Sequence, residues 1–285
     1  MTFRRLRRGL SPYPQLLAAI PDPPPVLWVR GDADSEVLSR PAVAIVGARA
    51  CSSYGRSVAR SLGRELAAAG LVVVSGLARG VDGEAHRGAL DVGGTTVGVL
   101  GCGIDRDYPA AHRELARQIV EQGLIVSEYE AGIEPAPWRF PARNRIIAGL
   151  SFATVVVEAR ERSGALITAD FALEDGREVM VVPGEITSTV SAGSNALLRL
   201  GATPVTAARD VLEAFGLEPR VNEPQHFGGV AGRMLELLGA HPGSIDELAR
   251  ASRLTPADVA AALTELELSG LVSEEEGVYR VSLSR

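Results

Sequence analysis

Lysine is absent from this sequence, cysteine occurs twice and histidine four times. All 29 basic residues are therefore arginines. The absence of lysine excludes the ordinary phosphate loop of nucleoside triphosphatases, which ends in Gly-Lys-Ser/Thr. Cys51 and Cys102 belong to no Cys-x-x-Cys pair and the histidines are scattered, so the sequence supports neither a disulfide framework nor a zinc site. We expect no metal and no cofactor.

Long hydrophobic runs are also absent. No apolar stretch approaches the roughly 20 residues that a membrane-spanning helix needs. The basic segment at residues 4–8 is followed by Ser11-Pro12-Tyr13-Pro14 rather than by the apolar core of a signal peptide. The sequence therefore predicts a cytoplasmic protein without a membrane partner. Its 285 residues, 46% of them hydrophobic, can bury one large and one small core.

Positive charge is in deficit, since 35 acidic residues against 29 arginines give a net charge of −6. Proteins that bind nucleic acid indiscriminately carry a positive excess, so any nucleic-acid site on this chain must be local. Residues 49–64 hold four arginines and no acid, whereas residues 228–285 hold five arginines and nine acids. The arginine-rich segment lies in the first domain, which is where we expect such a site.

Apolar runs alternate with helical segments from residue 43 onward. The predicted strands are 43–46, 71–75, 95–100, 124–127, 154–157 and 178–182. Continuous Val/Ile runs separated by helices are typical of a parallel sheet covered on both faces. We therefore predict an α/β fold, a Rossmann-like doubly wound and mainly parallel sheet, with a small C-terminal winged-helix domain.

Four segments organise the chain. Residues 1–40 are rich in proline and are predicted to form an extended N-terminal arm, with a short strand at Val26–Val29, that leads into the sheet. Residues 41–216 are predicted to form an extended Rossmann-like domain, in which we expect any DNA-binding site to lie, and 217–229 are predicted to form a linker. In 230–285 three helical segments and a hairpin are predicted, and Ser244 with Glu247 forms a capping box at the start of the second helix. This order is that of a winged-helix domain.

Residues 140–151 contain the clearest sign of anion binding. Pro141 precedes Arg143, Asn144 and Arg145, which we predict to lie at the mouth of a short apolar helix. The unpaired N–H groups of a first helical turn and the helix dipole both attract anions, and the arginines add fixed charge. The alternative is a helix whose arginines are solvated or paired with glutamates.

Loops after the predicted strands define the rest of the site, because ligands bind beyond the carboxyl ends of a parallel sheet. These loops are rich in Gly, Ser and Arg, and those we expect to shape or contact the ligand are Gly47, Arg49, Gly76, Ser163 and Gly164. Glycines let a ligand approach the backbone, while serines at helix starts can hold phosphate oxygens. Trp138 or Phe140 can stack on a base.

No set of catalytic residues emerges. The segment Gly47-Ala48-Arg49-Ala50-Cys51-Ser52 lacks the Gly-x-Gly-x-x-Gly pattern of dinucleotide-binding folds. Asp82 and His86 lie four residues apart on one helix face and could form an acid/base pair, or they could be ordinary helix residues. We predict that the protein is not an enzyme. An alternative that stays open is a Rossmann-type nucleotide or nucleoside-phosphate hydrolase, and a third is a partner-recruiting module.

Several motifs in order over about 170 residues resemble the DNA-processing protein A (DprA, also called Smf) family. They are Val43 to Arg49, Ser75-Gly76-Leu77-Ala78-Arg79-Gly80-Val81-Asp82 with His86, Tyr108-Pro109, Ser127-Glu128-Tyr129, Phe140 to Ser151, Glu158-Ala159, Ser163 to Ala169, and Pro183-Gly184. The resemblance implies an extended Rossmann fold that binds single-stranded DNA as a homodimer. It also implies a role in loading the recombinase RecA during natural transformation.

The resemblance also assigns individual residues. Arg49, in the family's Gly-Ser/Thr-Arg turn, and Arg143 and Arg145, in its Phe-Pro-x-Arg-Asn-Arg segment, carry over as DNA contacts. Ala48 departs from the Ser or Thr usual in that turn, and Arg139 stands near a position where relatives often carry a lysine. The dimer contact is implied near Leu197, Leu198 and Leu200, although this helix could instead pack on its own sheet.

Overall fold

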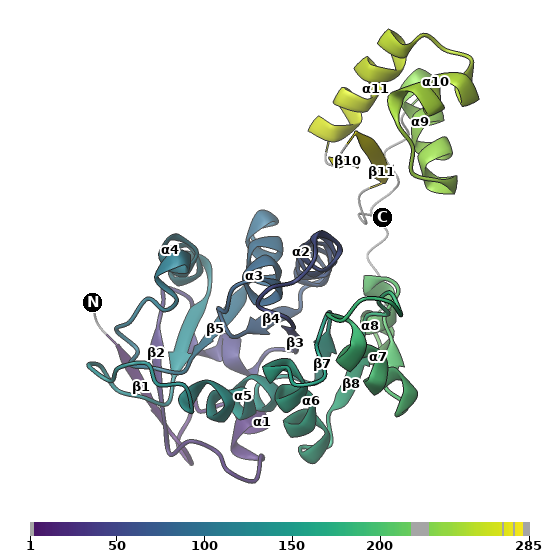
Figure 1. Cartoon of the computed structure of the whole chain (residues 1–285). Helices are drawn as coiled ribbons and strands as arrows, with labels where there is room; N and C mark the ends of the chain where they lie inside the picture. Colours follow the sequence, from purple (N-terminus) through teal and green to yellow (C-terminus); the bar gives the residue numbers. More distant parts are fainter. Residues whose placement is uncertain (1–2, 218–227, 270, 276, 282–285) are drawn as a thin grey trace. The chain divides into compact units, whose positions relative to one another are not determined.

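The computed structural model describes residues 3–217, 228–269, 271–275 and 277–281 (Figure 1). It divides into two compact units at residues 219 and 220, and each is described by itself. No helix within the described ranges is long and apolar enough to span a bilayer.

A nine-stranded sheet forms the centre of the first unit, in the order β1-β2-β6-β5-β4-β3-β7-β8-β9. The strands from β6 to β9 in that order run parallel, while β1 and β2 continue the sheet beyond β6 in antiparallel pairing. The bounds are β1 (Arg4–Arg7), β2 (Val26–Arg30), β3 (Ala42–Val46), β4 (Val72–Ser75), β5 (Thr96–Leu100), β6 (Leu124–Ser127), β7 (Ala153–Val156), β8 (Glu178–Val181) and β9 (Thr203–Pro204). The predicted mainly parallel sheet is confirmed.

Helices cover both faces of this sheet (Figure 1). One face packs against α2 (Ser53–Ala68), α3 (Val81–Asp91), α4 (Arg113–Gln122) and α8 (Ala208–Ala214). The other packs against α1 (Gln15–Ala18), α5 (Arg139–Gly149), α6 (Gly164–Glu174) and α7 (Ala192–Arg199). Short 3-10 helices occur at Ser35–Ser39 and Ala110–His112.

The central strand shows how the sequence divides between the two cores. In β3, Val43 and Ile45 face the α2 and α3 side, whereas Ala44 and Val46 face the α5 and α6 side. All four are buried, as expected where side chains alternate across a sheet that is covered twice. This double burial explains why the strand has no polar face in the sequence.

The switch point of the fold lies between β3 and β7, which are adjacent and parallel. The chain leaves β3 toward α2 on one face and leaves β7 toward α6 on the other. Because the two connections diverge, they open a crevice at the carboxyl ends of the strands, where such folds bind ligands.

Residues 3–40 contribute two strands to the sheet rather than forming an extended arm, and the strand predicted at Val26–Val29 is β2. They form β1, α1 and β2, and Leu6, Leu17 and Leu27 are buried in the core of the first unit. β1 was not predicted because three of its four residues are arginines and only Leu6 is apolar. Charged side chains are common on edge strands, where they prevent pairing with another chain. The prolines lie between these elements and do not keep the segment extended.

The second unit contains α9 (Gly229–Ala240), α10 (Ile245–Ser252), α11 (Pro256–Leu268) and the hairpin of β10 (Val272–Glu275) and β11 (Val278–Val281). Met234, Leu248 and Leu263 are buried in a core of its own. The predicted capping box is present, because Ser244 and Glu247 exchange hydrogen bonds at the start of α10. The three helices and hairpin of the predicted winged helix are confirmed, whereas the predicted linker falls almost wholly outside the described residues.

Candidate nucleic-acid interface

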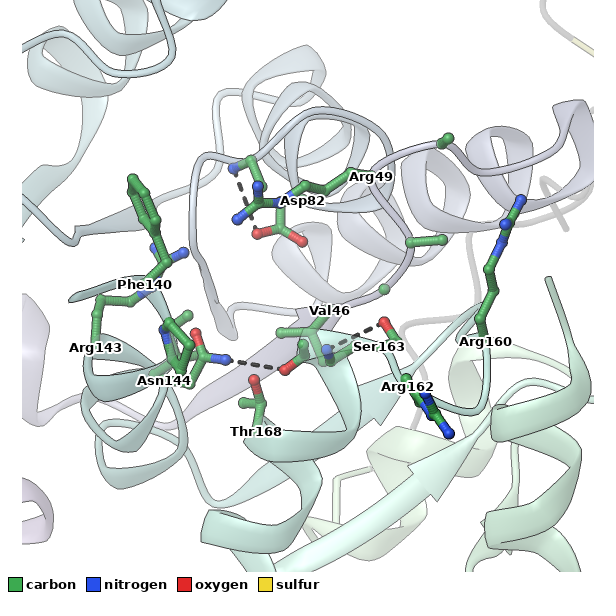
Figure 2. Close-up of a pocket in the computed structure, with 18 residues that line it drawn as sticks. Val46, Arg49, Asp82, Phe140, Arg143, Asn144, Arg160, Arg162, Ser163 and Thr168 are labelled. Carbon is green, nitrogen blue, oxygen red and sulfur yellow. Dashed lines mark hydrogen bonds between the residues drawn. The ribbon is translucent and has the colours of Figure 1, made fainter. Parts of the chain in front are cut away.

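A cleft of about 300 Å³ opens at the switch point (Figure 2). Its walls come from the turn after β3, the first half of α5, the loop after β7 and the start of α6. The predicted contact residues that line it are Gly47, Arg49, Phe140, Arg143, Asn144, Ser163 and Gly164. Gly76, Arg139 and Arg145 are not among its lining residues.

The turn after β3 requires glycine for lack of space. A Cβ atom on Gly47 would lie 2.6 Å from Val81 Cγ2. The turn is fixed by the Ala48 N–H, which donates to Glu158 O at 2.7 Å. This rigid backbone presents Arg49 to solvent, with its guanidinium 5.5 Å from the centre of the Phe140 ring.

The start of α2 is already occupied by an anion from the protein. Ser52 N donates to Glu158 Oε2 at 2.9 Å, and Ser52 Oγ donates to Oε1 at 2.5 Å. Glu158 is only 2% exposed. The N-terminus of α2 is therefore closed to a ligand phosphate, although it follows the first strand of the parallel sheet.

The start of α6 faces the cleft instead. Ser163 is its N-cap and accepts a hydrogen bond from Ala165 N at 3.3 Å. Gly164 is exposed, and nothing lies within 4 Å of the position that a Cβ atom would take there. Asn144 Nδ2 donates to Gly164 O at 2.9 Å and fixes this turn against α5. A helix start open to solvent can hold an anion.

The arginines of α5 do not lie at the mouth of a helix, contrary to the prediction. The helix begins at Arg139, so Arg143 and Arg145 lie one turn or more inside it. Pro141 falls in the first turn, where a missing N–H breaks no helical hydrogen bond. The N-terminal N–H groups of α5 are thus separated from these two guanidinium groups.

Arg143 is 4% exposed and closes the ends of two strands. Its Nη1 donates to Gly76 O at 2.7 Å and to Val99 O. A Cβ atom on Gly76 would lie 2.4 Å from that nitrogen, so a larger residue there would displace the Arg143 guanidinium. Burial lowers the pKa of Arg143 to about 10, against the effect of nearby Asp82, and the side chain is still cationic at neutral pH.

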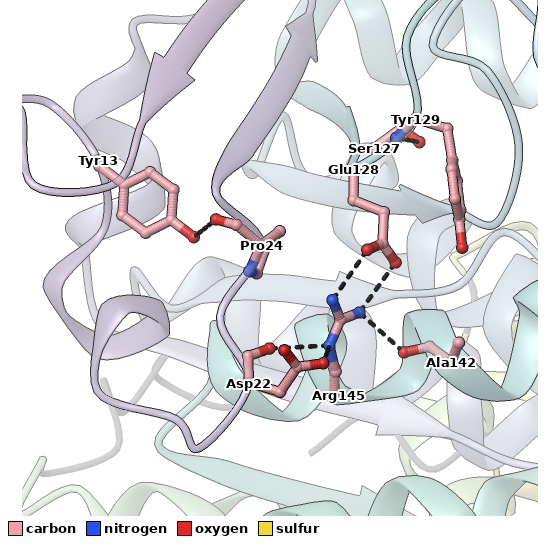
Figure 3. Close-up of polar contacts among 8 residues, drawn as sticks. All are labelled: Tyr13, Asp22, Pro24, Ser127, Glu128, Tyr129, Ala142 and Arg145. Carbon is pink, nitrogen blue, oxygen red and sulfur yellow. Dashed lines mark hydrogen bonds and ion pairs between the residues drawn. The ribbon is translucent and has the colours of Figure 1, made fainter.

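Arg145 is held by two carboxylates (Figure 3). Its Nη1 and Nη2 donate to the two oxygens of Glu128 at 2.9 and 2.8 Å, and its Nε donates to Asp22 O at 2.9 Å and Oδ2 at 3.0 Å. The side chain is 12% exposed. This arginine joins the first segment of the chain, the end of β6 and α5, which matches the alternative of a paired arginine.

Aromatic side chains form the outer part of the α5 wall. Phe140 stacks on Tyr108 with ring centres 5.1 Å apart, and Trp138 is 63% exposed. The Arg139 guanidinium lies 4.9 Å from the Trp138 ring and 5.0 Å from the Tyr129 ring. Partly exposed aromatic rings beside arginines are suited to stacking on unpaired bases.

Arg160 and Arg162 lie in the loop between β7 and α6 and were not among the predicted contact residues. Both are exposed and line the cleft on the side away from Phe140 (Figure 2). Their position between a strand end and the capping residue Ser163 was the available signal, since that position is the usual ligand side of a parallel sheet.

The possible acid/base pair is structural. His86 is fully buried with its Nδ1 2.7 Å from Thr96 Oγ1, while Asp82 Oδ2 accepts from Gly76 N at 3.1 Å. Burial raises the pKa of Asp82 and lowers that of His86 to about 3. The Cys51 thiol has its pKa raised by burial and so is not activated. Within the described part of the chain, no three His, Cys, Asp or Glu side chains are grouped to hold a metal ion.

The predicted dimer residues behave differently from one another. Leu197 and Leu198 are half-buried and pack against the core of their own unit. Leu200 is 84% exposed, and with Leu197 it lines a hollow between α6 and α7. A dimer contact on this face stays a prediction.

Comparison with known proteins places these features in context. A family model described as DNA recombination-mediator protein A matches residues 6–216, and one described as DprA winged helix domain matches residues 222–277. The DNA processing protein DprA of Streptococcus pneumoniae is 45% identical over 207 residues, 71% of either chain. Protein Smf of Escherichia coli is 40% identical over 279 residues, 94% of this chain and 74% of that protein.

Solved structures give the same result. The X-ray structure of the Streptococcus pneumoniae protein matches with a TM-score of 0.71 and 43% identity, covering 74% of each chain. DNA processing protein A from Helicobacter pylori, described for its unique single-stranded DNA binding mode, matches with a TM-score of 0.67 and 32% identity over 75% of this chain and 95% of that one.

Proposed function

Because this chain belongs to the DNA recombination-mediator protein A family of DNA-processing proteins, we propose that it binds single-stranded DNA in the cleft at the switch point. The observation that carries the proposal is the combination of Arg49, set over the Phe140 ring, with the open start of α6. The arginine and the helix start suit phosphate, and the ring suits a base.

A single strand is the expected ligand because its bases present free faces. Phe140, Tyr108 and Trp138 offer aromatic surfaces that a stacked duplex cannot use. The net charge of −6 limits attraction outside the cleft. Binding is therefore local, weakly dependent on sequence and steeply dependent on salt.

The predicted residues divide into two groups in this proposal. Arg49, Arg139, Phe140, Ser163 and Gly164 contact the strand. Gly47, Gly76, Arg143, Asn144 and Arg145 fix the walls that present those groups, since they are tight glycines or side chains bonded to the protein.

The wider role that we propose rests on the family resemblance. The protein protects incoming single-stranded DNA and helps to load RecA during natural transformation, as a cytoplasmic homodimer joined near Leu197, Leu198 and Leu200. It does so without a catalytic step. Two observations support this: His86 is fully buried and is not among the residues that line the cleft, while Asp82, which does line it, accepts hydrogen bonds from Gly76 N and Ala78 N.

Polarisation titrations test the binding proposal. A labelled oligonucleotide is titrated as a single strand and as a duplex of the same sequence, at two salt concentrations. We expect at least tenfold tighter binding of the single strand, and weaker binding by Arg49→Ala. Equal affinity for both forms would refute the proposal. Incubation with free nucleotides tests the alternative hydrolase, which would release base or phosphate.

A further inference from the structure

The loop between β7 and α6 carries two cations that the proposed contacts leave out. Arg160 and Arg162 are exposed, and both border the cleft. Over residues 3–217 neither guanidinium makes an ion pair within 4 Å or donates a hydrogen bond, although Glu161 lies between them in sequence. Arg145, by contrast, is bonded to two carboxylates. The two loop arginines thus keep their donors available.

Contacts of three consecutive residues, 158 to 160, fix the backbone of this loop. Before it, Glu158 is bonded to the start of α2 through Ser52. Ala159 O accepts hydrogen bonds from Gly193 N at 2.7 Å and Ser194 N at 3.1 Å, both in the first turn of α7. Arg160 O accepts one from Ser163 N at 3.0 Å. Because these contacts already fix the loop backbone, a bound strand does not have to order it, which lowers the entropic cost of binding.

Close packing shows that this position of the loop is built into the fold. A Cβ atom on Gly193 would lie 2.5 Å from Arg160 O and 2.8 Å from Ala159 O. Only glycine therefore allows α7 to approach the loop so closely. The approach keeps the loop against α7 and leaves its outer side to the cleft, where Gly164 provides open space beside Arg162.

Figure 2 shows the two arginines across the cleft from Phe140. A strand whose bases stack on the α5 side would place its phosphates toward the β7 side. Guanidinium groups with free donors are well suited to phosphate oxygens. Resting on the proposed function, we infer that Arg160 and Arg162 each bind a backbone phosphate of single-stranded DNA.

Salt dependence measures the number of phosphate contacts. The logarithm of the association constant falls linearly with the logarithm of the salt concentration, and each phosphate contact to a single strand makes this slope steeper by about 0.7. At 0.1 M salt one such contact therefore strengthens binding about fivefold. We expect Arg160→Ala and Arg162→Ala each to weaken binding about fivefold, and the double variant about 25-fold with a slope lower by about 1.4. Lysine at both positions should keep most of the slope, because it keeps the charge.

Arg117→Ala is the matched control. Arg117 is exposed on α4 and paired with Glu114 and Glu121, so its removal changes the net charge equally without touching the cleft. Its slope should equal that of the unaltered protein. Melting temperatures of all variants should stay close to that of the parent, since Arg160 and Arg162 donate no hydrogen bond within residues 3–217 and the ion pairs of Arg117 are exposed to solvent.

The absence of lysine allows a direct test of proximity. Arg160→Lys or Arg162→Lys introduces the only side-chain amine in the protein. A single strand with one abasic site presents an aldehyde, which condenses with a nearby amine to an imine and water, and borohydride reduces the imine to a stable amine link. We expect covalent trapping with either variant, and only the background of the terminal amine with Arg117→Lys or the unaltered protein.

The outcomes separate the inference from the proposed function. If the unaltered protein fails to bind single-stranded DNA, the proposed function falls and the inference falls with it. If the unaltered protein binds, but the double alanine variant keeps its slope and the lysine variants trap no more DNA than the controls, only the inference is overturned.

Discussion

Arg145 illustrates how a positively charged residue near a binding cleft can serve the fold. Its guanidinium donates to Glu128 through two nitrogens and to Asp22 through a third. The Glu128 pair is shielded, with side chains 12% and 16% exposed, whereas Asp22 is 85% exposed and adds little. Its donors are used inside the protein, and few are left for a phosphate.

Replacing Arg145 by Ala should therefore lower the stability of the fold more than it lowers the affinity for DNA. We expect a loss of about 2–3 kcal/mol in the free energy of unfolding, because Glu128 loses its partner in a shielded site. DNA affinity should fall only as far as α5 loosens, with an unchanged salt slope. Denaturant unfolding and salt titrations measure the two effects.

Glu128→Ala provides the opposing test at the same site. If Arg145 were a phosphate donor held in reserve, removing Glu128 would free it and strengthen DNA binding. We expect lower stability and no gain in affinity. A tighter complex in this variant, with a steeper salt slope, would show that Arg145 contacts DNA.

His86 gives the protein a defined sensitivity to acid. Burial, with a smaller effect of His112, lowers its pKa to about 3, against about 6.5 in the unfolded chain. The unfolded state therefore binds the proton more readily. The stability from neutral His86 is complete above pH 6.5 and is lost as the pH falls toward 3.

At pH 5 this loss amounts to about 2 kcal/mol relative to pH 7. His86→Gln should lower stability at pH 7 but flatten its decline between pH 6.5 and 4. Denaturant unfolding of both proteins across this range measures the difference. An equally steep decline in the variant would assign the acid sensitivity to other groups.

Long-range contacts explain which site residues the sequence could identify. The pattern at residues 140–151 correctly located α5 beside the cleft, but the partners of Arg143 are Gly76 and Val99, which lie 67 and 44 residues away. Nothing local distinguishes a guanidinium that closes strand ends from one that faces solvent. Strand-end position alone was the stronger guide, and it applied equally to Arg160 and Arg162.

At the scale of elements, α2 and α3 pack through glycines. A Cβ atom on Gly88 would lie 2.0 Å from Arg60 O and 2.9 Å from Arg64 N, and one on Gly63 would lie 2.3 Å from Ala85 O. These neighbours are backbone atoms, which cannot rotate away. The two helices therefore pack closer together than larger side chains would allow.

Gly88→Ala should consequently destabilise the first unit. Alanine favours a helix by about 1 kcal/mol over glycine, but separating the two helices costs about 2–3 kcal/mol as in other overpacked cores. A net loss of about 1–2 kcal/mol follows, and calorimetry of the variant measures it as a lower melting temperature.

Gly239→Ala is the matched control for this substitution. Gly239 lies in α9 of the second unit, and nothing is within 4 Å of its Cβ position. The same change there should stabilise its unit by up to about 1 kcal/mol. Opposite signs at the two positions are expected, and a gain at Gly88 would show that the helices can part without cost.

The elements that could be predicted from the sequence are those with a clear hydrophobic pattern. The buried strands β3 to β8 are mainly apolar runs, and the capping box of Ser244 and Glu247 marks the start of α10. The edge strands were not predicted because β9 has only two residues and β1 contains three arginines and a single core leucine. The start of α5 was placed too late because Pro141 suggested an entry, whereas proline is tolerated in a first turn.

At the scale of the whole molecule, the two units differ in charge and have separate cores. Residues 228–285 hold five arginines and nine acids, and the core around Met234 and Leu263 is independent of the first unit. In winged-helix proteins the third helix enters the major groove and needs a positive face. Here α11 exposes Asp258, Glu265 and Glu267 and contains no arginine.

A chain ending at Leu217 should therefore keep most of its affinity for single-stranded DNA. The cleft and its walls lie wholly within the first unit, and the removed unit would repel phosphate rather than attract it. We expect affinity within about threefold of the whole chain, an equal salt slope, and weak or no binding by residues 228–285 alone. Circular dichroism checks that the shortened chain is folded. A loss of more than about tenfold, or 1.4 kcal/mol, in a folded protein would assign part of the DNA site to the second unit.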